Sequence, residues 1–171
     1  MRRKSLILWA WLACPCLILS STGTAQALEV TGWYNDGWDN ESHAVYLKYH
    51  DLFTEVNPYW YNLETSDGHI YERAYVYDPQ KVKEIHAQGD LIIPAIGDGT
   101  KGQIDAILLN THAQNNLIEN LAKVVKERNY DGWDLNFEGG SSEVQKEFAE
   151  FVEKLAHRLH QEKKRLHVTL K

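Results

Sequence analysis

One stretch of the 171-residue sequence decides its fold: Asp131-Gly132-Trp133-Asp134-Leu135-Asn136-Phe137-Glu138. From Trp133 onward its apolar and polar residues alternate, which is the pattern of a β-strand. Alternation places Asp134, Asn136 and Glu138 on one face, with neighbours about 6.6 Å apart along the strand, and the apolar residues on the other face. A polar row inside a sheet is costly unless it lines a cavity or is fully hydrogen-bonded. The stretch therefore predicts a strand whose polar face either belongs to a functional site or is satisfied by neighbouring strands.

Strand and helix patterns alternate on both sides of this stretch. Asp78-Pro79 supplies an N-cap and a first helical residue, and Gly89 ends the same helix. Asp67-Gly68 is typical of a hairpin turn that returns a short strand over residues 70–77. The remaining patterns predict strands over 28–34, 55–63, 91–96, 130–138 and 166–170, and helices over 43–53, 79–88, 112–128 and 144–159.

Short connections between alternating strands and helices favour parallel strands joined by right-handed crossovers. Two architectures have this pattern, an open doubly wound sheet and part of an eight-stranded barrel. No glycine-rich phosphate loop follows any predicted strand, which disfavours the nucleotide-binding open sheet. The sequence thus predicts an α/β fold of the (β/α)8 TIM-barrel type that stops after the fifth strand. Because a closed barrel needs eight strands and about 250 residues, we expect these residues to be its N-terminal portion.

The first 27 residues differ from the rest of the chain. Three basic residues precede an apolar run from Leu6 to Leu19, and small residues follow up to Ala27, which is the order of a secretory signal peptide. The run is short for a membrane span and Pro15 interrupts it, so a retained anchor is not expected. We expect residues 1–27 to be a signal peptide and residues 28–171 to be a single secreted, extracytoplasmic domain.

Loss of the signal peptide would remove both cysteines, Cys14 and Cys16, and three of the 18 basic residues. The remaining 15 basic and 24 acidic residues give residues 28–171 a formal charge of −9. Such a chain repels phosphates, so neither nucleic acid nor an anionic membrane is an expected partner. Without cysteine, a disulfide scaffold and a zinc–thiolate site are excluded, and no metal or other cofactor is expected.

Residues 131–138 resemble the Asp-x-x-Asp-x-Asp-x-Glu signature of family 18 glycoside hydrolases, the chitinases and their relatives. All four polar positions have the family's spacing, although Asn136 stands where the family usually has Asp. The aromatic segment Asn57-Pro58-Tyr59-Trp60-Tyr61 is more similar to the bacterial spore-cortex and cell-wall branch. The resemblance covers most of residues 28–171 and implies the first five strands of the family's barrel.

The resemblance also implies a mechanism. Family members cleave β-1,4 bonds next to N-acetylglucosamine with retention, using the substrate's acetamido oxygen as the nucleophile. Glu138 then matches the general acid and base, and Asp134 the negative charge that helps to keep it protonated. Asn136 would orient the acetamido N–H without adding charge, while Asp131 and Gly132 would hold the strand end in place. The implied substrate is a polysaccharide or glycan containing N-acetylglucosamine: chitin or peptidoglycan, with a glycoprotein glycan as an open alternative.

Aromatic residues are candidates for contact with sugar rings, because flat apolar faces suit pyranose surfaces. Trp33 and Trp60, or their direct neighbours in the sequence, are the predicted substrate contacts. Asp98 follows the third strand at the same end of the predicted barrel, where capping a loop and catalysis are equal alternatives. Two other functions stay open: a carbohydrate-binding relative with little catalysis, which Asn136 favours, and an incomplete module, because the family completes its site with later strands.

Overall fold

A computed structural model describes residues 28–35, 41–73, 77–100 and 102–169, and the predicted signal peptide lies outside the described residues. The strands are β1 (Thr31–Tyr34), β2 (Glu55–Leu63), β3 (Ile70–Glu72), β4 (Leu91–Ile92), β5 (Ala95–Gly97), β6 (Gly132–Asn136) and β7 (Arg165–Val168). The helices are α1 (Ser42–Tyr49), α2 (Pro79–Gln88), α3 (Gln103–Leu108), α4 (Thr111–Glu127) and α5 (Gln145–His160), with short 3₁₀ turns at His50–Leu52 and Ser142–Val144.

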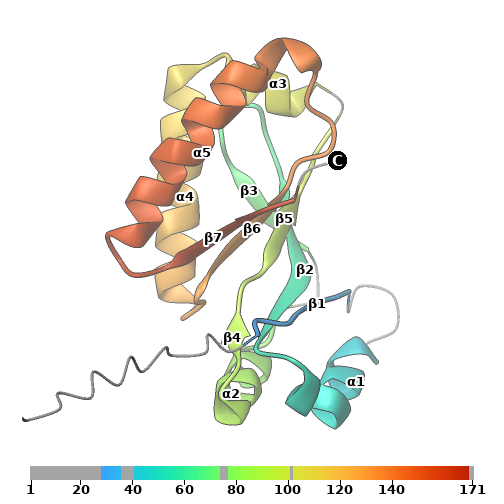
Figure 1. Cartoon of the computed structure of the whole chain (residues 1–171). Coiled ribbons are helices and arrows are strands. Elements are labelled where there is room, and N and C mark those ends of the chain that lie inside the picture. Colours follow the sequence, from blue (N-terminus) through green and yellow to red (C-terminus); the bar gives the residue numbers. More distant parts are fainter. Residues whose placement is uncertain (1–27, 36–40, 74–76, 101, 170–171) are drawn as a thin grey trace, which may run out of the picture.

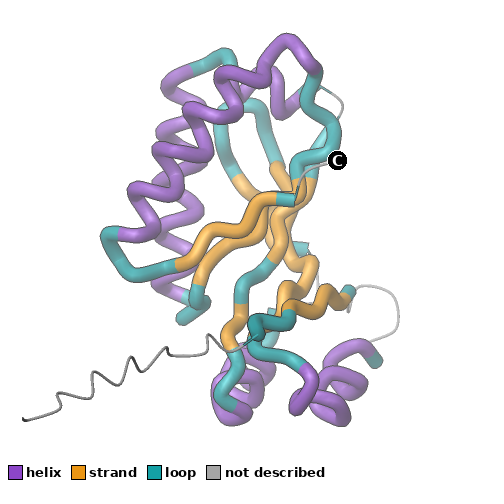
Figure 2. The backbone as a smooth tube through the Cα atoms, in the orientation of Figure 1, coloured by secondary structure: helices purple, strands orange, loops and turns teal. Residues whose placement is uncertain are grey.

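The strands form one sheet in the order β1-β2-β5-β6-β7, in which every neighbouring pair is parallel (Figures 1 and 2). β4 pairs in parallel with the beginning of β2, and β3 pairs antiparallel with its end. β4 and β5 are the two halves of the predicted strand over 91–96, separated at Ile93-Pro94. The predicted α/β fold of the TIM-barrel type is confirmed, and within the described residues the sheet does not close on itself.

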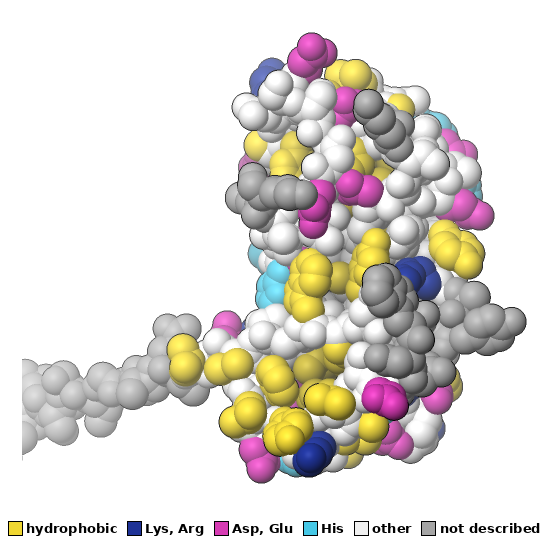
Figure 3. All heavy atoms as spheres, turned by 90° about the vertical axis from the view of Figure 1, so that its right-hand side faces the viewer, with side chains coloured by type: hydrophobic (Ala, Val, Ile, Leu, Met, Phe, Trp, Pro, Cys, Tyr) yellow, Lys and Arg dark blue, Asp and Glu magenta, His cyan; other side chains and the backbone are white. Residues whose placement is uncertain are grey.

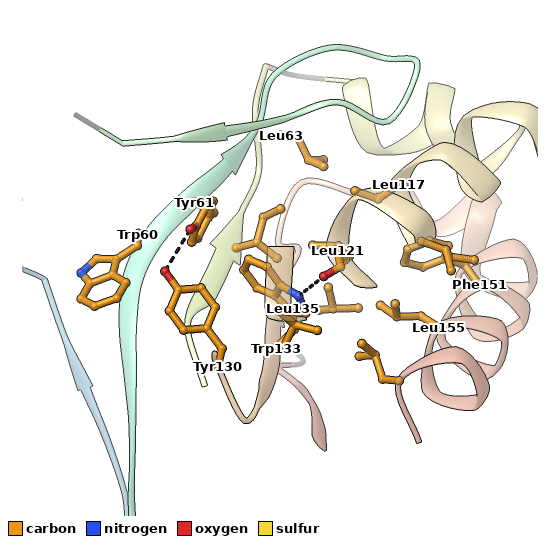
Figure 4. Close-up of a cluster of buried hydrophobic side chains, with 14 of the residues drawn as sticks. Trp60, Tyr61, Leu63, Leu117, Leu121, Tyr130, Trp133, Leu135, Phe151 and Leu155 are labelled. Atoms are coloured by element: carbon orange, nitrogen blue, oxygen red, sulfur yellow. Dashed lines mark hydrogen bonds between the residues drawn. The ribbon is translucent and has the colours of Figure 1, made fainter. Parts of the chain in front are cut away.

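An irregularity in β2 decides which of its aromatic side chains face the helices. Tyr59 pairs with Ala95 and Tyr61 with the next residue, Ile96, so that Trp60 is an extra residue of a β-bulge. The side chain of Trp60 therefore lies on the face of the sheet opposite to that of Tyr59, and the side chain of Tyr61 lies on the same face as that of Trp60. Both are almost completely buried in the core and both contact the ring of Tyr130 (Figure 4).

The core lies between the outer face of the sheet and the helices (Figure 4). The apolar alternation of β6 puts Trp133 and Leu135 against α4 and α5, whose inward stripe repeats at helical spacing. The indole N–H of Trp133 donates to the carbonyl of Leu121 at 2.9 Å, so its polar atom is satisfied inside the core. This packing fixes the outer face of β6 and turns its other face toward the barrel interior.

The elements follow the sequence pattern closely, with differences besides the division of the strand over 91–96. The predicted strand over 130–138 is shorter, because β6 covers Gly132–Asn136. The return strand predicted over 70–77 is shorter, because β3 covers only Ile70–Glu72. Helix α3 was not predicted, although its buried residues Ile104, Ile107 and Leu108 have helical spacing. None of the helices in the described ranges is long and apolar enough to cross a membrane.

The outer edge of the sheet at β1 is apolar. A hollow of about 520 Å³ lies between β1 and α1. Val45, Tyr49 and Leu52 on its walls are about half exposed or more, and hydrophobic side chains gather over this end of the molecule (Figure 3). In the described part of the chain β1 has a strand neighbour on one side only, so it presents an open sheet edge.

Candidate active site

The inner face of the sheet begins with a charged layer around Glu55, whose side chain is 2% exposed. Its carboxylate accepts hydrogen bonds from the hydroxyl of Thr31 and from Nη1 of Arg165, the latter at 3.1 Å. Nε2 of His167 lies 3.5 Å from the same carboxylate. Arg165 of β7 thus supplies the opposite charge to a buried carboxylate at the amino-terminal end of the strands, and Thr31 of β1 adds a hydrogen bond, as the filled interior of a barrel requires.

The next layer holds Asp134, the second acid of the signature, which is 1% exposed. Oδ2 of Asp134 accepts from Nδ2 of Asn57 at 2.9 Å, and Oδ1 lies 3.3 Å from the donating hydroxyl of Thr169. Nδ2 of Asn57 is also 3.4 Å from Nδ1 of His167. Asn57, Thr169 and His167 were not predicted to belong to the site. The alternation of Glu55, Asn57 and Tyr59 along β2 was the available signal for Asn57.

The upper layer is a set of amide oxygens at the carboxyl ends of the strands. Asn62, Gly97 and Asn136 are aligned across β2, β5 and β6. The side-chain oxygens of Asn62 and Asn136, and that of Asn57 in the layer of Asp134, are buried and accept no hydrogen bond from any described residue. Buried acceptors are normally satisfied, so this layer is suited to a ligand that donates hydrogen bonds, such as one with N–H and hydroxyl groups.

Glu138 lies two residues beyond β6 and is exposed. Its backbone N–H donates to Oδ1 of Asp98 at 3.0 Å, and the Asp98 carbonyl accepts from Nδ2 of Asn62 at 3.1 Å. Of the two roles considered for Asp98, the contacts are those of a residue that fastens the loop carrying Glu138. Glu138 also borders a hollow of about 330 Å³ together with Phe137 and Ser141.

Asp131 and Gly132 lie at the opposite end of β6 from Glu138. Oδ2 of Asp131 accepts from Nε2 of His86 at 2.8 Å and from the backbone N–H of Ile92 at 3.0 Å. A Cβ on Gly132 would lie 2.3 Å from the carbonyl oxygen of Arg165, so only glycine allows β6 and β7 to approach this closely. Both residues are therefore placed to fix the start of the strand.

The two tryptophans predicted to contact sugar have different positions. Trp33 is 50% exposed near the end of β1. The prediction for Trp60 is wrong, because the alternation of β2 places its indole on the face opposite to Tyr59, in the core, where it is 0% exposed. Its neighbour Tyr59 instead faces inward, and its ring covers Gly97, where a Cβ would lie 2.2 Å from the phenol oxygen.

The inner face of the sheet therefore combines buried, hydrogen-bonded carboxylates with unpaired amide oxygens at the end where barrel active sites lie. In the described residues there is no group of three or more His, Cys, Asp or Glu side chains that could hold a metal ion. The chemistry available at this end is proton transfer by a carboxylic acid next to polar groups that orient a substrate.

Solved structures share this fold. A class V chitinase from Pseudomonas fluorescens Pf-5 is 20% identical, with a TM-score of 0.74 over 82% of this chain and 44% of that one. The spore cortex-lytic enzyme SleL of Bacillus megaterium QM B1551 is 19% identical, with a TM-score of 0.71 over 83% of this chain and 34% of SleL. The C-terminal domain of a chitinase from Desulfitobacterium hafniense DCB-2 is 21% identical, with a TM-score of 0.70 over 82% and 45%. The chain thus spans less than half of each.

Sequence comparison agrees with the fold. No curated protein sequence matches the chain significantly. The family model of the glycosyl hydrolases family 18 matches residues 30–171, which include the whole described sheet and the signature strand. The chain therefore belongs to family 18 of the glycosyl hydrolases.

Proposed function

We propose that the protein is a secreted glycoside hydrolase that cleaves β-1,4 bonds next to N-acetylglucosamine in chitin or peptidoglycan. The reaction retains the anomeric configuration, and the acetamido oxygen of the substrate attacks the anomeric carbon in place of a protein nucleophile. Glu138 protonates the leaving oxygen and then, as the carboxylate, accepts a proton from the water that opens the cyclic intermediate. The proton thus returns to Glu138, and one water is consumed for each bond cleaved.

The observation that carries the proposal is the inner face of β6. Asp134 is buried there with Asn57 and Thr169 on its oxygens, and Asn136 presents above it an amide oxygen that accepts no hydrogen bond from the described residues. That oxygen is suited to accept the acetamido N–H of the substrate, which would orient the acetamido carbonyl toward the anomeric carbon. Glu138 follows on the same alternation, at the carboxyl end where barrel enzymes place their acids.

A carbohydrate-binding relative with little catalysis is the second candidate, and Asn136 is the observation that favours it. An amide oxygen accepts the same hydrogen bond as a carboxylate but adds no negative charge beside the positively charged intermediate. Loss of one such electrostatic contribution costs on the order of 10²–10³ in rate. The retained Glu138 favours slow turnover over none.

The decisive experiment replaces Glu138 with Gln in the whole protein and measures turnover and affinity on a chito-oligosaccharide and on peptidoglycan glycan chains. We expect the rate to fall at least about 100-fold while the affinity stays within a factor of about two. Glu143→Gln is the matched control, because Glu143 is an exposed glutamate in the loop after Glu138. Equal activity of the Glu138→Gln variant and the parent would refute the assigned acid, whereas sugar binding without any turnover in the parent would favour the binding protein.

Export from the cell is a separate part of the proposal. It is supported by the order of basic, apolar and small residues over 1–27. The intact mass of the protein recovered outside the producing cells tests it: the amino terminus is expected at Leu28. Protein that retains residues 1–27, or that stays inside the cells, would contradict the signal-peptide assignment.

A further inference from the structure

Arg73, which follows β3, lies at the carboxyl end of the sheet beside the proposed site. Its Nη1 donates to the side-chain oxygen of Asn35 at 3.1 Å and to the carbonyl of Tyr59 at 2.9 Å. The guanidinium carbon lies 4.6 Å from the centroid of the Tyr59 ring. The same ring covers Gly97, which pairs with Asn136. The guanidinium is therefore held in a fixed orientation next to the inner layer of the site.

This arginine differs from the others in its charge partners. Arg73 is partly buried, yet it forms no ion pair with any described carboxylate. The other three arginines in the described residues each have carboxylate partners: Arg128 has Glu72, Arg158 has Glu119 and Glu162, and Arg165 has Glu29 and Glu55. A partly desolvated cation without a counter-charge is costly, in a chain that has six more acidic than basic residues.

The hydrogen-bonding capacity of Arg73 is only partly used. A guanidinium has five N–H donors, and only those on Nη1 have hydrogen-bond partners among the described residues. Nε and Nη2 form the planar edge that binds a carboxylate through two parallel hydrogen bonds. Stacking on Tyr59 covers a face of the guanidinium and leaves that edge in plane. A carboxylate, which accepts two parallel hydrogen bonds, fits this edge better than a single hydroxyl or amide does.

We propose that Arg73 is a specificity-determining residue that binds a carboxylate on the glycan, so that the site prefers a carboxylate-bearing N-acetylglucosamine polymer, as peptidoglycan is, over uncharged chitin. This inference rests on the proposed function. Tyr59 belongs to β2 and Asn136 to β6, two strands apart, which is about 10 Å across a sheet. A polymer along this end of the sheet thus presents to Arg73 a sugar other than the one at Asn136.

The test measures binding without turnover, using the whole protein with Glu138→Gln. The ligands are peptidoglycan glycan chains freed of peptide, which carry lactyl carboxylates, the same chains after methyl esterification, and chito-oligosaccharides of equal length. We expect Arg73→Gln to weaken binding of the first ligand at least about 10-fold and to leave the other two unchanged. Peptide-bearing chains distinguish the source of the carboxylate: if only they respond to Arg73→Gln, the stem peptide supplies it.

Lys48→Gln is the matched control, because Lys48 is an exposed cation that lies over Tyr49 on α1. It changes the net charge equally and should leave all affinities unchanged, while Arg73→Lys should restore part of the preference. Equal weakening of every ligand by Arg73→Gln, or unchanged binding of both the peptide-free and the peptide-bearing chains by this variant, would overturn the proposal. Turnover of glycan that depends on Glu138, without any preference for carboxylate-bearing chains, would support the hydrolase proposal and refute the role of Arg73. Binding that depends on the carboxylate, without any turnover by the parent protein, would support the role of Arg73 and refute the hydrolase proposal.

Discussion

Replacing Asp131 with Ala separates the structural acid of the signature from Glu138, the proposed catalytic acid. Oδ2 of Asp131 accepts two hydrogen bonds, from His86 and from the backbone N–H of Ile92, a residue that is 0% exposed. A hydrogen bond to a charged group contributes about 1.5–3 kcal/mol, and a buried N–H left without an acceptor costs about 1–3 kcal/mol. The Asp131 side chain is 26% exposed, which lowers the contribution of its charged hydrogen bonds. We therefore expect Asp131→Ala to lower the free energy of unfolding by about 3 kcal/mol.

The assay is urea unfolding followed by tryptophan fluorescence. For a slope of about 2 kcal/mol/M, a loss of about 3 kcal/mol moves the midpoint down by about 1.5 M. Asp131→Asn keeps an acceptor oxygen for both donors and should cost less than half as much. Asp105→Ala removes one hydrogen bond to the exposed backbone N–H of Ser141 and should stay within about 1 kcal/mol.

Turnover supplies the second half of the test. In buffer without urea, at a temperature where the Asp131→Ala variant is fully folded, its kcat should stay within a factor of about three of the parent. Glu138→Gln should instead lower kcat without lowering the urea midpoint. A midpoint for Asp131→Ala that matches the parent would refute the anchoring role. A loss of kcat as large as that of Glu138→Gln would show instead that Asp131 acts on the chemistry.

Three further outcomes are expected. Asn136→Asp should raise kcat on a chito-oligosaccharide by on the order of 10²–10³, and an unchanged or lower rate would contradict the assigned role. Trp60→Phe should destabilise the protein by about 1–3 kcal/mol and leave substrate affinity unchanged, while Trp33→Ala should weaken affinity with little effect on the unfolding midpoint. Burial raises the pKa of Tyr61 and Tyr130 above the ordinary value, so their contribution to stability is complete below about pH 10 and is lost as the pH rises further; ultraviolet titration should show their ionisation only with unfolding.

Much of the fold could be predicted because its strands and helices repeat strong local patterns. The helix from Pro79 to Gln88 has its N-cap at Asp78 and its left-handed C-cap at Gly89, as the residue types indicate. The alternation over 131–138 correctly predicted which side of β6 packs against α4 and α5, because an apolar face has no other place to be buried.

The parts that could not be predicted depend on contacts between distant segments. The environment of Trp60 was predicted wrongly because residue types do not show which face of β2 packs against the helices. The bulge that also brings Tyr61 to that face is visible only in the pairing of β2 with β5. His167 and Thr169 are more than 30 residues from Asp134, and only the parallel register of β6 and β7 brings them to it. Residue types alone also gave no reason to select Arg73, whose significance lies in the carboxylate that it lacks among the described residues.

The bulge at Trp60 divides β2 into two independently supported halves. The first half, up to Pro58, takes its register from β1 and β4, and the second half takes its register from β5 and β3. Substitutions in the hairpin that carries Arg73 can therefore alter the rim of the site while Glu55 and Asn57 keep their partners. The fold thereby separates the hairpin that carries Arg73, whose sequence can vary, from the layer of Glu55 and Asn57, which must stay constant for the strands to pair.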